Sequence, residues 1–380
     1  MGSLFSLSHL ALAASASRMA FDRIRLADFR NHQATRLEGT ARFNLLVGPN
    51  GAGKTNVLEA LSLFTPGRGL RRAQLSEMSR DDAPGFAIGA DLVSGVTPVR
   101  LGTAVQAGDG SGPSRRIVQA SGAALPASRL AEWLSVAWLT PAMDRLFMDS
   151  ASGRRRFLDR MVLAIRPEHA SHSGRYEKAL RERNRLLSGD RSPDPTWLDA
   201  LEKEMAEAGA AIAENRAAVV EMLAERLATL PDQPFARPEI AIDPSSPTDA
   251  DALAARWRSA RPAERGAGRT LHGPHRDDLS VHMAGTGRPA ADCSTGEQKA
   301  LLIAITLAHA MLADGGRPLV LLLDEVAAHL DPVRRAALFE RLEASGAQVW
   351  MTGTELALFT GLEGKASVWR VTGGAVEKEA

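Results

Sequence analysis

At 380 residues the chain is longer than a typical single domain, so one large split domain or two lobes are expected. Its only cysteine, Cys293, excludes an intramolecular disulfide, and no run approaches the roughly 20 apolar residues that span a bilayer. A net charge of +1 does not by itself indicate nucleic-acid binding, because the position of the basic residues decides that. We therefore expect a cytoplasmic protein that binds no membrane.

The first 18 residues are small and mildly apolar, and they lack the basic start that a signal peptide needs. We expect residues 1–18 to be a disordered tail or a non-native extension. From Met19 onward the pattern is that of a folded domain, because Phe21–Leu26 alternates apolar and polar residues and predicts a strand.

A phosphate-binding loop follows the next predicted strand, Phe43–Val47, and precedes a predicted helix over Asn56–Phe64. The loop matches G-x-x-x-x-G-K-[ST], and strand, loop and helix stand in the order that this motif requires. In such a loop the backbone amides surround phosphates, the lysine reaches the outer phosphates and the hydroxyl can hold Mg²⁺. The predicted ATP site comprises Gly48, Pro49, Asn50, Gly51, Ala52, Gly53, Lys54 and Thr55, with Thr55 as a Mg²⁺ ligand.

The middle of the chain changes character. Gly85–Gln119 predicts antiparallel strands and turns, with a turn or mobile loop over Asp109–Ser114. Two long helices are then predicted, over Arg154–Leu187 and Trp197–Leu230, separated by the turn Gly189–Pro195. The first is rich in arginine and the second in glutamate, which fits a hairpin with solvated opposite charges. The arginine-rich helix also offers a surface suited to DNA, and both interpretations stay open.

The last part of the chain returns to alternating strands and helices. Asp232–Pro247 is proline-rich and predicts the return linker, and regular patterns resume from Leu271. Pro318–Glu325 is an apolar run that ends in two carboxylates, as a buried parallel strand does at the edge of a sheet. Asp324 is expected to hold Mg²⁺ there, and Glu325 to orient the attacking water. Acidic capping of a helix start is the alternative for this pair.

Ser294–Lys299 predicts a second anion-binding helix start. Ser294 and the glutamate three residues later fit a capping box before a strongly apolar helix. The same serine, together with the amide of Gly296, also forms a surface suited to phosphate. This surface does not easily reach the nucleotide of its own chain if the two lie on opposite sides of the head. We therefore expect a facing subunit to use it.

The order of phosphate loop, long insertion, Ser-rich helix start, acidic strand and Ala328-His329-Leu330-Asp331 resembles the ATP-binding heads of the ABC superfamily. Within it, the chain is similar to the RecF family of bacterial recombination mediators, which is related to the SMC heads. RRRFLD, HGPHRDDL and STGEQK together are specific to this family, whereas the phosphate loop and acidic strand are shared by many ATPases. The matching segments are Asp28–Asn31, Lys54–Ala60, Arg154–Asp159, Arg183–Asn184, His272–Leu279 and Ser294–Lys299.

The resemblance implies an α/β fold, with an ABC-type P-loop ATPase head (lobe I) and an inserted, largely helical lobe II. Lobe I is expected over residues 19–150 and 251–380, and lobe II over 151–250. ATP and Mg²⁺ are the implied cofactors, bound between two copies of the chain. Each site would take Lys54, Thr55, Asp324 and Glu325 from one copy and Ser294 with Gly296 from the other. The matched motifs add Arg30, Asn31 and Asn56 to the expected nucleotide site.

The resemblance also implies a function in DNA replication, repair and recombination. The ATP-dependent homodimer would close on single- and double-stranded DNA and help to load RecA at gaps and ss–dsDNA junctions, as part of the SOS response. RecR and RecO are the implied partners. Slow, DNA-stimulated ATP hydrolysis is expected as a switch rather than as metabolic catalysis.

Two departures separate the chain from the transporter branch of the ABC superfamily. No histidine stands in Val349–Glu355, where transporter ATPases carry a switch residue and this chain has Thr352 and Thr354. No clear glutamine precedes Thr140 either, and the sensor of the terminal phosphate is therefore unassigned. The alternatives are a transporter ATPase subunit, another SMC-like ATPase and a nuclease-coupled ATPase.

His272 and His275 lie close to two aspartates and suggest a zinc site, but neither a cysteine nor a third histidine accompanies them. The resemblance explains these histidines instead as part of a family motif of the positioning type.

Overall fold

Largely apolar runs form four strands of the central sheet of the molecule. The computed structural model describes residues 20–81, 83–93, 98–106, 115–189, 193–313 and 317–379. The strand order is β15–β14–β3–β13–β12–β8, and β14 to β8 run parallel. Every residue of β3, β8, β12 and β13 is buried, as expected for parallel strands covered on both faces. The bounds are β3 Phe43–Val47, β8 Ser135–Leu139, β12 Leu319–Leu323, β13 Gln348–Gly353, β14 Ala366–Thr372 and β15 Ala375–Lys378.

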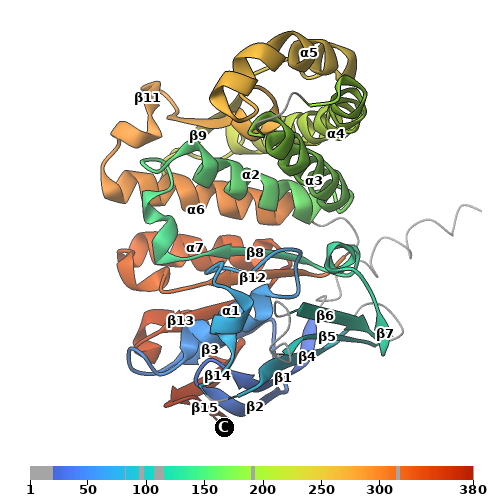
Figure 1. Ribbon diagram of the computed structural model, residues 1–380. Helices are drawn as coiled ribbons and strands as arrows, with labels where there is room; N and C mark the ends of the chain where they lie inside the picture. Colours follow the sequence, from blue (N-terminus) through green and yellow to red (C-terminus); the bar gives the residue numbers. More distant parts are fainter. Residues whose placement is uncertain are drawn as a thin grey trace, which may run out of the picture.

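An antiparallel sheet covers one face of the central sheet, with helix α1 (Lys54–Ser62) packed in the same core (Figure 1). Its order is β2–β1–β4–β5–β6–β7. Leu58 of α1, Ile24 of β1 and Leu322 of β12 belong to this one buried cluster. The strands are β1 Phe21–Phe29, β2 His32–Glu38, β4 Gly85–Leu92, β5 Val99–Gln106, β6 Arg115–Ala120 and β7 Ala123–Ala124.

Helices α2 (Ala151–Ile165), α6 (Thr295–Leu312) and α7 (Pro332–Ala344) cover the other face. Leu321 of β12 packs in the same core as these helices, whereas its neighbour Leu322 packs with α1. Successive side chains of a strand point to opposite faces, so α1 and α6 lie on opposite faces of the central sheet.

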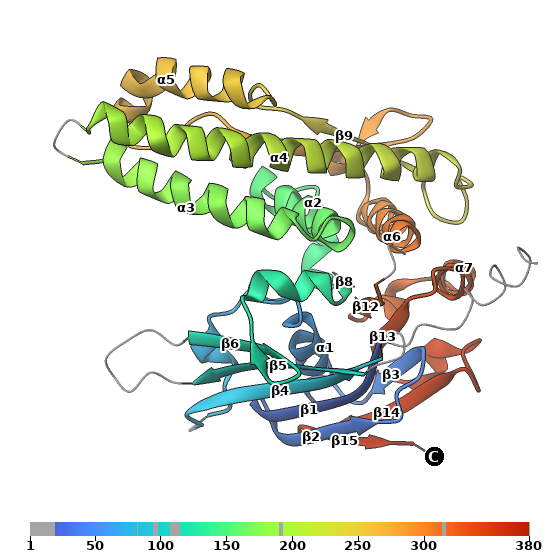
Figure 2. The same ribbon diagram turned by 90° about the vertical axis from the view of Figure 1, so that its right-hand side faces the viewer.

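A helical part stands above the sheets. Helices α3 (His169–Leu187) and α4 (Pro195–Ala228) run alongside each other, and α5 (Ala250–Ala267) packs on α4 (Figure 2). They share a small core that includes Tyr176, Met205 and Trp257. A three-stranded sheet in the order β11–β10–β9 joins this part to the rest, with bounds β9 Pro238–Asp243, β10 Asp278–Met283 and β11 Arg288–Pro289. Short 3₁₀ helices occupy Leu75–Met78, Ala127–Glu132, Pro141–Arg145, Pro274–Arg276, Ala290–Asp292, Ala327–His329 and Leu356–Phe359.

The predicted helix over Arg154–Leu187 is wrong in one respect, because the structure has two helices there. Helix α2 ends at Ile165, and Arg166 leaves the helical region with φ −117° and ψ 86°. Pro167 explains the break, since proline lacks an N–H and disfavours helical backbone in the residue before it. The prediction over Trp197–Leu230 is confirmed to within a few residues by α4.

The predicted linker Asp232–Pro247 is also partly wrong, because it contains β9, which pairs with β10 along its whole length. Helix α5, which follows it, was not predicted. Asp249 caps its start by accepting the Ala252 N–H, but Pro262 stands inside the helix and disguises the pattern. Gly85–Gln119 does form the antiparallel strands β4, β5 and β6.

Several predicted segments lie outside the described residues: the extension over 1–18, the loop Asp109–Ser114 and part of the turn Gly189–Pro195. Within the part of the chain that is described, we find no helix with the length and apolar character of a membrane span.

Candidate functional site

The phosphate loop has a backbone geometry that requires glycine at Gly53. Gly53, the N-cap of α1, has φ 114°, a backbone conformation that residues other than glycine rarely adopt. A Cβ on Gly53 would also lie 2.7 Å from the side-chain amide of Asn31. Lys54 is buried and folds back over the loop, where its Nζ donates to the carbonyls of Gly48 at 2.6 Å and Pro49 at 2.9 Å.

The acidic strand end meets this loop. Thr55 Oγ1, in the first turn of α1, donates to Asp324 Oδ1 at 2.9 Å, although 269 residues separate them. Burial raises the pKa of Asp324, and hydrogen bonds from Thr352 and Thr55 oppose that rise. The predicted position of Asp324 beside the phosphate loop is therefore confirmed. Its role as a metal ligand stays a prediction.

Glu325 directly follows Asp324 and has an unusual backbone conformation. Its φ of 53° lies in the left-handed region, which is uncommon for a residue other than glycine. Its N–H donates to Thr352 Oγ1 at 2.9 Å. Burial lowers the pKa of Lys54, and the negative charges of Glu325 and Asp324 oppose that shift.

Arg30 and Asn31, in the turn between β1 and β2, lie against the same loop. Asn31 Nδ2 donates to the carbonyl of Ala52 at 3.0 Å, and Asn56 Nδ2 donates to Asn31 Oδ1 at 2.7 Å. Arg30 forms a two-pronged pair with Glu59 of α1, at 2.8 and 2.9 Å. The structure thus brings these predicted residues beside the phosphate loop, where Arg30 acts on the helix rather than on the loop itself.

The sequence analysis did not identify Glu59, on which Arg30 and Arg71 converge. Glu59 is fully buried and also accepts from Arg71 Nη1 at 2.8 Å, and Arg71 bonds to Asn56 Oδ1 at 2.6 Å. A glutamate on the inner face of α1, four residues after Thr55, was a usable signal, because buried carboxylates need cationic partners.

Ser294 and Gly296 stand at the start of α6. The local prediction is confirmed, because Ser294 accepts from the Glu297 N–H while the Glu297 carboxylate accepts from the Ser294 N–H at 2.8 Å. Helix α6 lies on the opposite face of the sheet from α1. Across the described ranges, no hydrogen bond or ion pair joins Ser294 to the phosphate loop.

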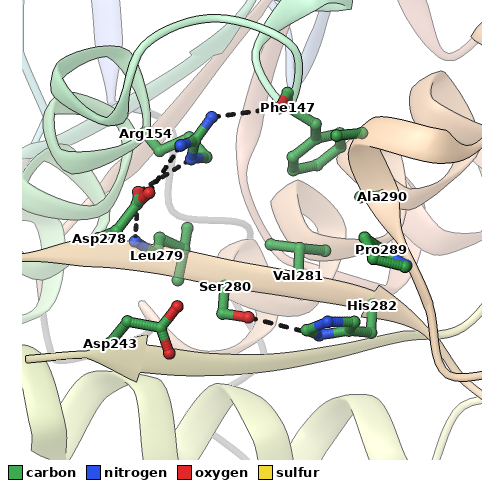
Figure 3. Close-up of a pocket in the computed structure, with 11 residues that line it drawn as sticks. Phe147, Arg154, Asp243, Asp278, Leu279, Ser280, Val281, His282, Pro289 and Ala290 are labelled. Carbon is green, nitrogen blue, oxygen red and sulfur yellow. Dashed lines mark hydrogen bonds and ion pairs between the residues drawn. The ribbon is translucent and has the colours of Figure 1, made fainter.

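The segments RRRFLD and HGPHRDDL brace the two parts of the molecule. Arg154 holds Asp278 through two hydrogen bonds of 2.8 and 2.6 Å, beside a cavity of about 190 Å³ (Figure 3). Asp159 of α2 binds Arg216 of α4 at 2.8 and 3.0 Å. Both contacts tie α2 to segments more than 50 residues away, at separations of 124 and 57 residues.

The two histidines of the second segment are hydrogen-bonding groups. His275 Nδ1 pairs with the Tyr176 hydroxyl at 2.7 Å, and His272 Nε2 pairs with Arg256 at 2.9 Å. Burial lowers the pKa of His275 to about 4, with a hydrogen bond to Thr270 opposing the shift. Their contacts fit the positioning interpretation of this motif.

Comparisons with known proteins cover nearly the whole chain. A family model described as an AAA domain matches residues 23–89. The DNA replication and repair protein RecF of Mesorhizobium japonicum is 47% identical over 367 residues, which cover 93% of this chain and 96% of that protein. The protein of the same name from Brucella suis is 45% identical, with 94% and 96% covered. That from Agrobacterium fabrum is 43% identical, with 95% and 99% covered.

Solved structures agree on the fold. The recombination mediator protein RecF–ATP in the RecFOR pathway has a TM-score of 0.84 at 22% identity, with 96% of this chain and 99% of that chain covered. The Smc head domain of Pyrococcus furiosus has a TM-score of 0.55 at 14% identity, with 95% and 96% covered. The predicted fold class, an ABC-type P-loop ATPase head with an inserted helical part, is confirmed.

Proposed function

The chain belongs to the RecF family of DNA replication and repair proteins, and from this we propose that it is an ATP-dependent, DNA-binding recombination mediator. The observation that carries the proposal is the contact between Thr55 and Asp324, which joins a complete phosphate loop to an acidic strand end. A solved neighbour named RecF–ATP supports ATP as the nucleotide. The transporter alternative loses its support, because relatives that span the chain carry the RecF name.

The side chains at this point fit Mg²⁺. The Thr55 hydroxyl and the Asp324 carboxylate are the hard oxygen donors that Mg²⁺ prefers, and this ion usually keeps further positions for water and phosphate oxygens. When bound, Mg²⁺ would offset the negative charge on the phosphates. Lys54 would exchange its bonds to the Gly48 and Pro49 carbonyls for bonds to the outer phosphates.

Glu325 is the proposed residue that orients the attacking water. Glu325 directly follows Asp324, which bonds to Thr55 of the phosphate loop, so it stands beside the loop where the phosphates would bind. A carboxylate there can hold the attacking water in line with the phosphorus and accept a proton from that water. We propose that hydrolysis is slow and stimulated by DNA, and that it serves as a switch.

A second copy of the chain would complete the site. Ser294 and Gly296 start a long helix whose N-terminal amides suit a phosphate, and α6 packs on the sheet face opposite α1. A two-fold dimer would bring the α6 start of one copy to the phosphate loop of the other. We propose residues 19–150 and 251–380 as the ATPase lobe and 151–250 as the helical lobe, with two exceptions at the boundaries: α2 packs in the core of the central sheet, and α5 packs in the core of the helical part. Helix α5, at the start of the last segment, packs on α4.

The dimer would bind single- and double-stranded DNA, and would help to load RecA at gaps and ss–dsDNA junctions during the SOS response. The solved neighbour is called a recombination mediator in the RecFOR pathway, which supports RecR and RecO as partners.

Nucleotide-driven dimerisation tests the proposal. Glu325→Gln should bind ATP with Mg²⁺ and accumulate as a dimer in sedimentation velocity, because binding is intact and hydrolysis is blocked. Bound ATP should persist in this variant and turn over in the wild type. A wild-type chain that binds no ATP would contradict the proposal.

Ser294→Arg should stay monomeric with ATP while its ATP affinity is nearly unchanged, because the residue acts on the other copy. Ser259→Arg is the matched control, since Ser259 is exposed on α5, and it should dimerise like the wild type. Loss of ATP binding by the Ser294 variant alone would place that residue in its own chain's site or in the fold.

A further inference from the structure

Thr352 joins the two carboxylate residues at the end of β12. Its side chain lies at the end of β13, the neighbouring strand, and is 1% exposed. Thr352 Oγ1 lies 2.8 Å from Asp324 Oδ1 and 2.9 Å from the backbone nitrogen of Glu325. One buried hydroxyl therefore contacts both residues of the acidic pair.

The directions of these two bonds are determined by chemistry. A backbone N–H can only donate, so Thr352 Oγ1 must accept from Glu325. The carboxylate of Asp324 accepts, so the single hydroxyl proton of Thr352 goes to Asp324 Oδ1. With its proton used in this way, Thr352 has none to donate to a phosphate oxygen. This argues against Thr352 as the unassigned sensor of the terminal phosphate.

The sheet explains why a hydroxyl is needed here. Strand β12 ends its pairing with β13 and β8 at Leu323. One residue later, the Asp324 N–H still donates to the Leu139 carbonyl of β8 at 2.9 Å. The next N–H, that of Glu325, donates to the Thr352 hydroxyl instead of a backbone carbonyl. A side chain of β13 thus extends the hydrogen-bond ladder by one position.

The hydrogen bond from the Glu325 N–H to the Thr352 hydroxyl restrains the backbone conformation of Glu325. The residue has φ 53°, a conformation that persists in non-glycine residues only where the surroundings hold it. Thr352 supplies such a restraint on its N–H, while the bond to Asp324 restrains the neighbouring carboxylate. Thr55 shares Asp324 Oδ1 at 2.9 Å, so Asp324 stays held by Thr352 even when Thr55 turns to another ligand.

We propose that Thr352 is a positioning residue that fixes Asp324 and Glu325 relative to each other for ATP hydrolysis, without contacting the nucleotide. The inference rests on the proposed function, because it assigns a role within the same site. Removing a group that orients a metal ligand in this way typically lowers metal affinity or activity by about 10–100-fold.

Two variants of Thr352 test the inference. Thr352→Val keeps the shape and removes the hydroxyl, so kcat for ATP should fall by about 10–100-fold while KM and the ATP dissociation constant stay nearly unchanged. Thr352→Ser keeps the hydroxyl and should restore kcat to near the wild-type value. Thr306→Val is the control, because Thr306 is buried as well and its hydroxyl bonds to the Leu302 carbonyl within α6.

A second readout needs no nucleotide. In hydrogen–deuterium exchange, the Glu325 amide should lose protection in Thr352→Val and keep it in Thr352→Ser. If wild-type chain fails to bind or hydrolyse ATP, the proposed function fails and this exchange measurement alone decides the positioning. Thr352→Ala replaces Thr352→Val if circular dichroism shows that the valine variant does not fold.

Two results would overturn the inference. Wild-type kcat together with unchanged protection of the Glu325 amide in Thr352→Val would mean that the hydroxyl positions neither residue. A loss of ATP affinity as large as the loss of kcat would mean that Thr352 contacts the nucleotide directly.

Discussion

Asp159 illustrates how single residues hold the two parts of the molecule together. The Arg216 guanidinium donates to both of its carboxylate oxygens, and His169 Nε2 lies 3.2 Å from Oδ1. Burial opposes its ionisation, but the hydrogen bond with His169 and the charge of Arg216 outweigh burial and hold the pKa of Asp159 at about 2. The carboxylate is therefore more acidic in the folded chain than in the unfolded one, where its pKa is near the ordinary 3.8.

A depressed folded pKa predicts a loss of stability in acid. The unfolded state binds the proton first, so the contribution of Asp159 is fully present above about pH 4 and is lost as pH falls towards about 2. Asp159→Asn should be less stable than the wild type at neutral pH, and the difference should shrink across this window. Urea midpoints at several pH values measure it.

Neighbouring groups must be separated from this effect. Asp277 also pairs with Arg216, at 3.3 Å, and burial raises its pKa, so its contribution to the slope has the opposite sign. The exposed Asp81→Asn is the control and should leave the acid slope unchanged. A constant difference between Asp159→Asn and the wild type from pH 7 to pH 2 would contradict the prediction.

At the scale of elements, three helices meet at one buried cation. Arg183 of α3 is fully buried and lies 2.9 Å from Glu202 of α4 and 2.6 Å from Glu264 of α5. Its guanidinium also donates to Thr270 at 2.8 Å, just after α5. Arg261 adds a second cation to Glu202 at 2.5 Å. The helical part is therefore joined by ion pairs in its interior as well as by its apolar core.

Removing Arg183 should destabilise the helical part strongly. Arg183→Met leaves Glu264 without its cation, and breaking a buried pair on one side typically costs about 3–5 kcal/mol. The urea midpoint should fall accordingly. Adding Glu264→Gln to Arg183→Met should recover part of the loss, because it removes the unpaired charge. No recovery in the double variant would mean that the ion pair is not the source of the effect.

At the scale of the whole molecule, the arginine-rich stretch divides into braces and exposed residues. Arg154 and Arg155 bind Asp278 and the Asp277 carbonyl, and so connect α2 to the β10 region. The side chains of Arg181 and Arg185 are 70% and 67% exposed, and their partners are glutamates of the same helix. Arg175 of α3 pairs with Glu204 and Glu207 of α4, as the hairpin with opposite charges predicts, and the DNA surface stays a prediction.

Replacing the exposed Arg181 and Arg185 with uncharged residues tests the proposed DNA surface. Arg181→Gln with Arg185→Gln should weaken DNA binding for any sequence and flatten its dependence on salt, by about 0.9 in log–log slope for each phosphate that is no longer neutralised. Titration of labelled duplex DNA at several salt concentrations measures both effects. Arg100→Gln, on β5 and 74% exposed, is the matched control. If the salt dependence of DNA binding did not change, this face of α3 would be a solvent-exposed surface that does not contact DNA.

Motifs formed by neighbouring residues could be predicted from the sequence. The phosphate loop, the acidic end of β12 and the capping box at Ser294 depend on residues next to one another, whose spacing carries the chemistry. Helix α4 has long, regular helical spacing and was predicted nearly to its ends. Where a local signal interrupts such spacing, as Pro262 does in α5, the prediction failed.

Contacts between distant residues were decided only by the tertiary structure. Strand β13 lies between β3 and β12, and this order brings Thr352 to Asp324 and Glu325, which no sequence spacing indicates. The convergence of Arg30 and Arg71 on Glu59 has the same origin. The physical reason is that the order of parallel strands depends on burying both faces of the sheet at once, which involves the whole chain. The sequence by itself indicated the residues proposed for the nucleotide site, and the packing decided which side chains hold them in place.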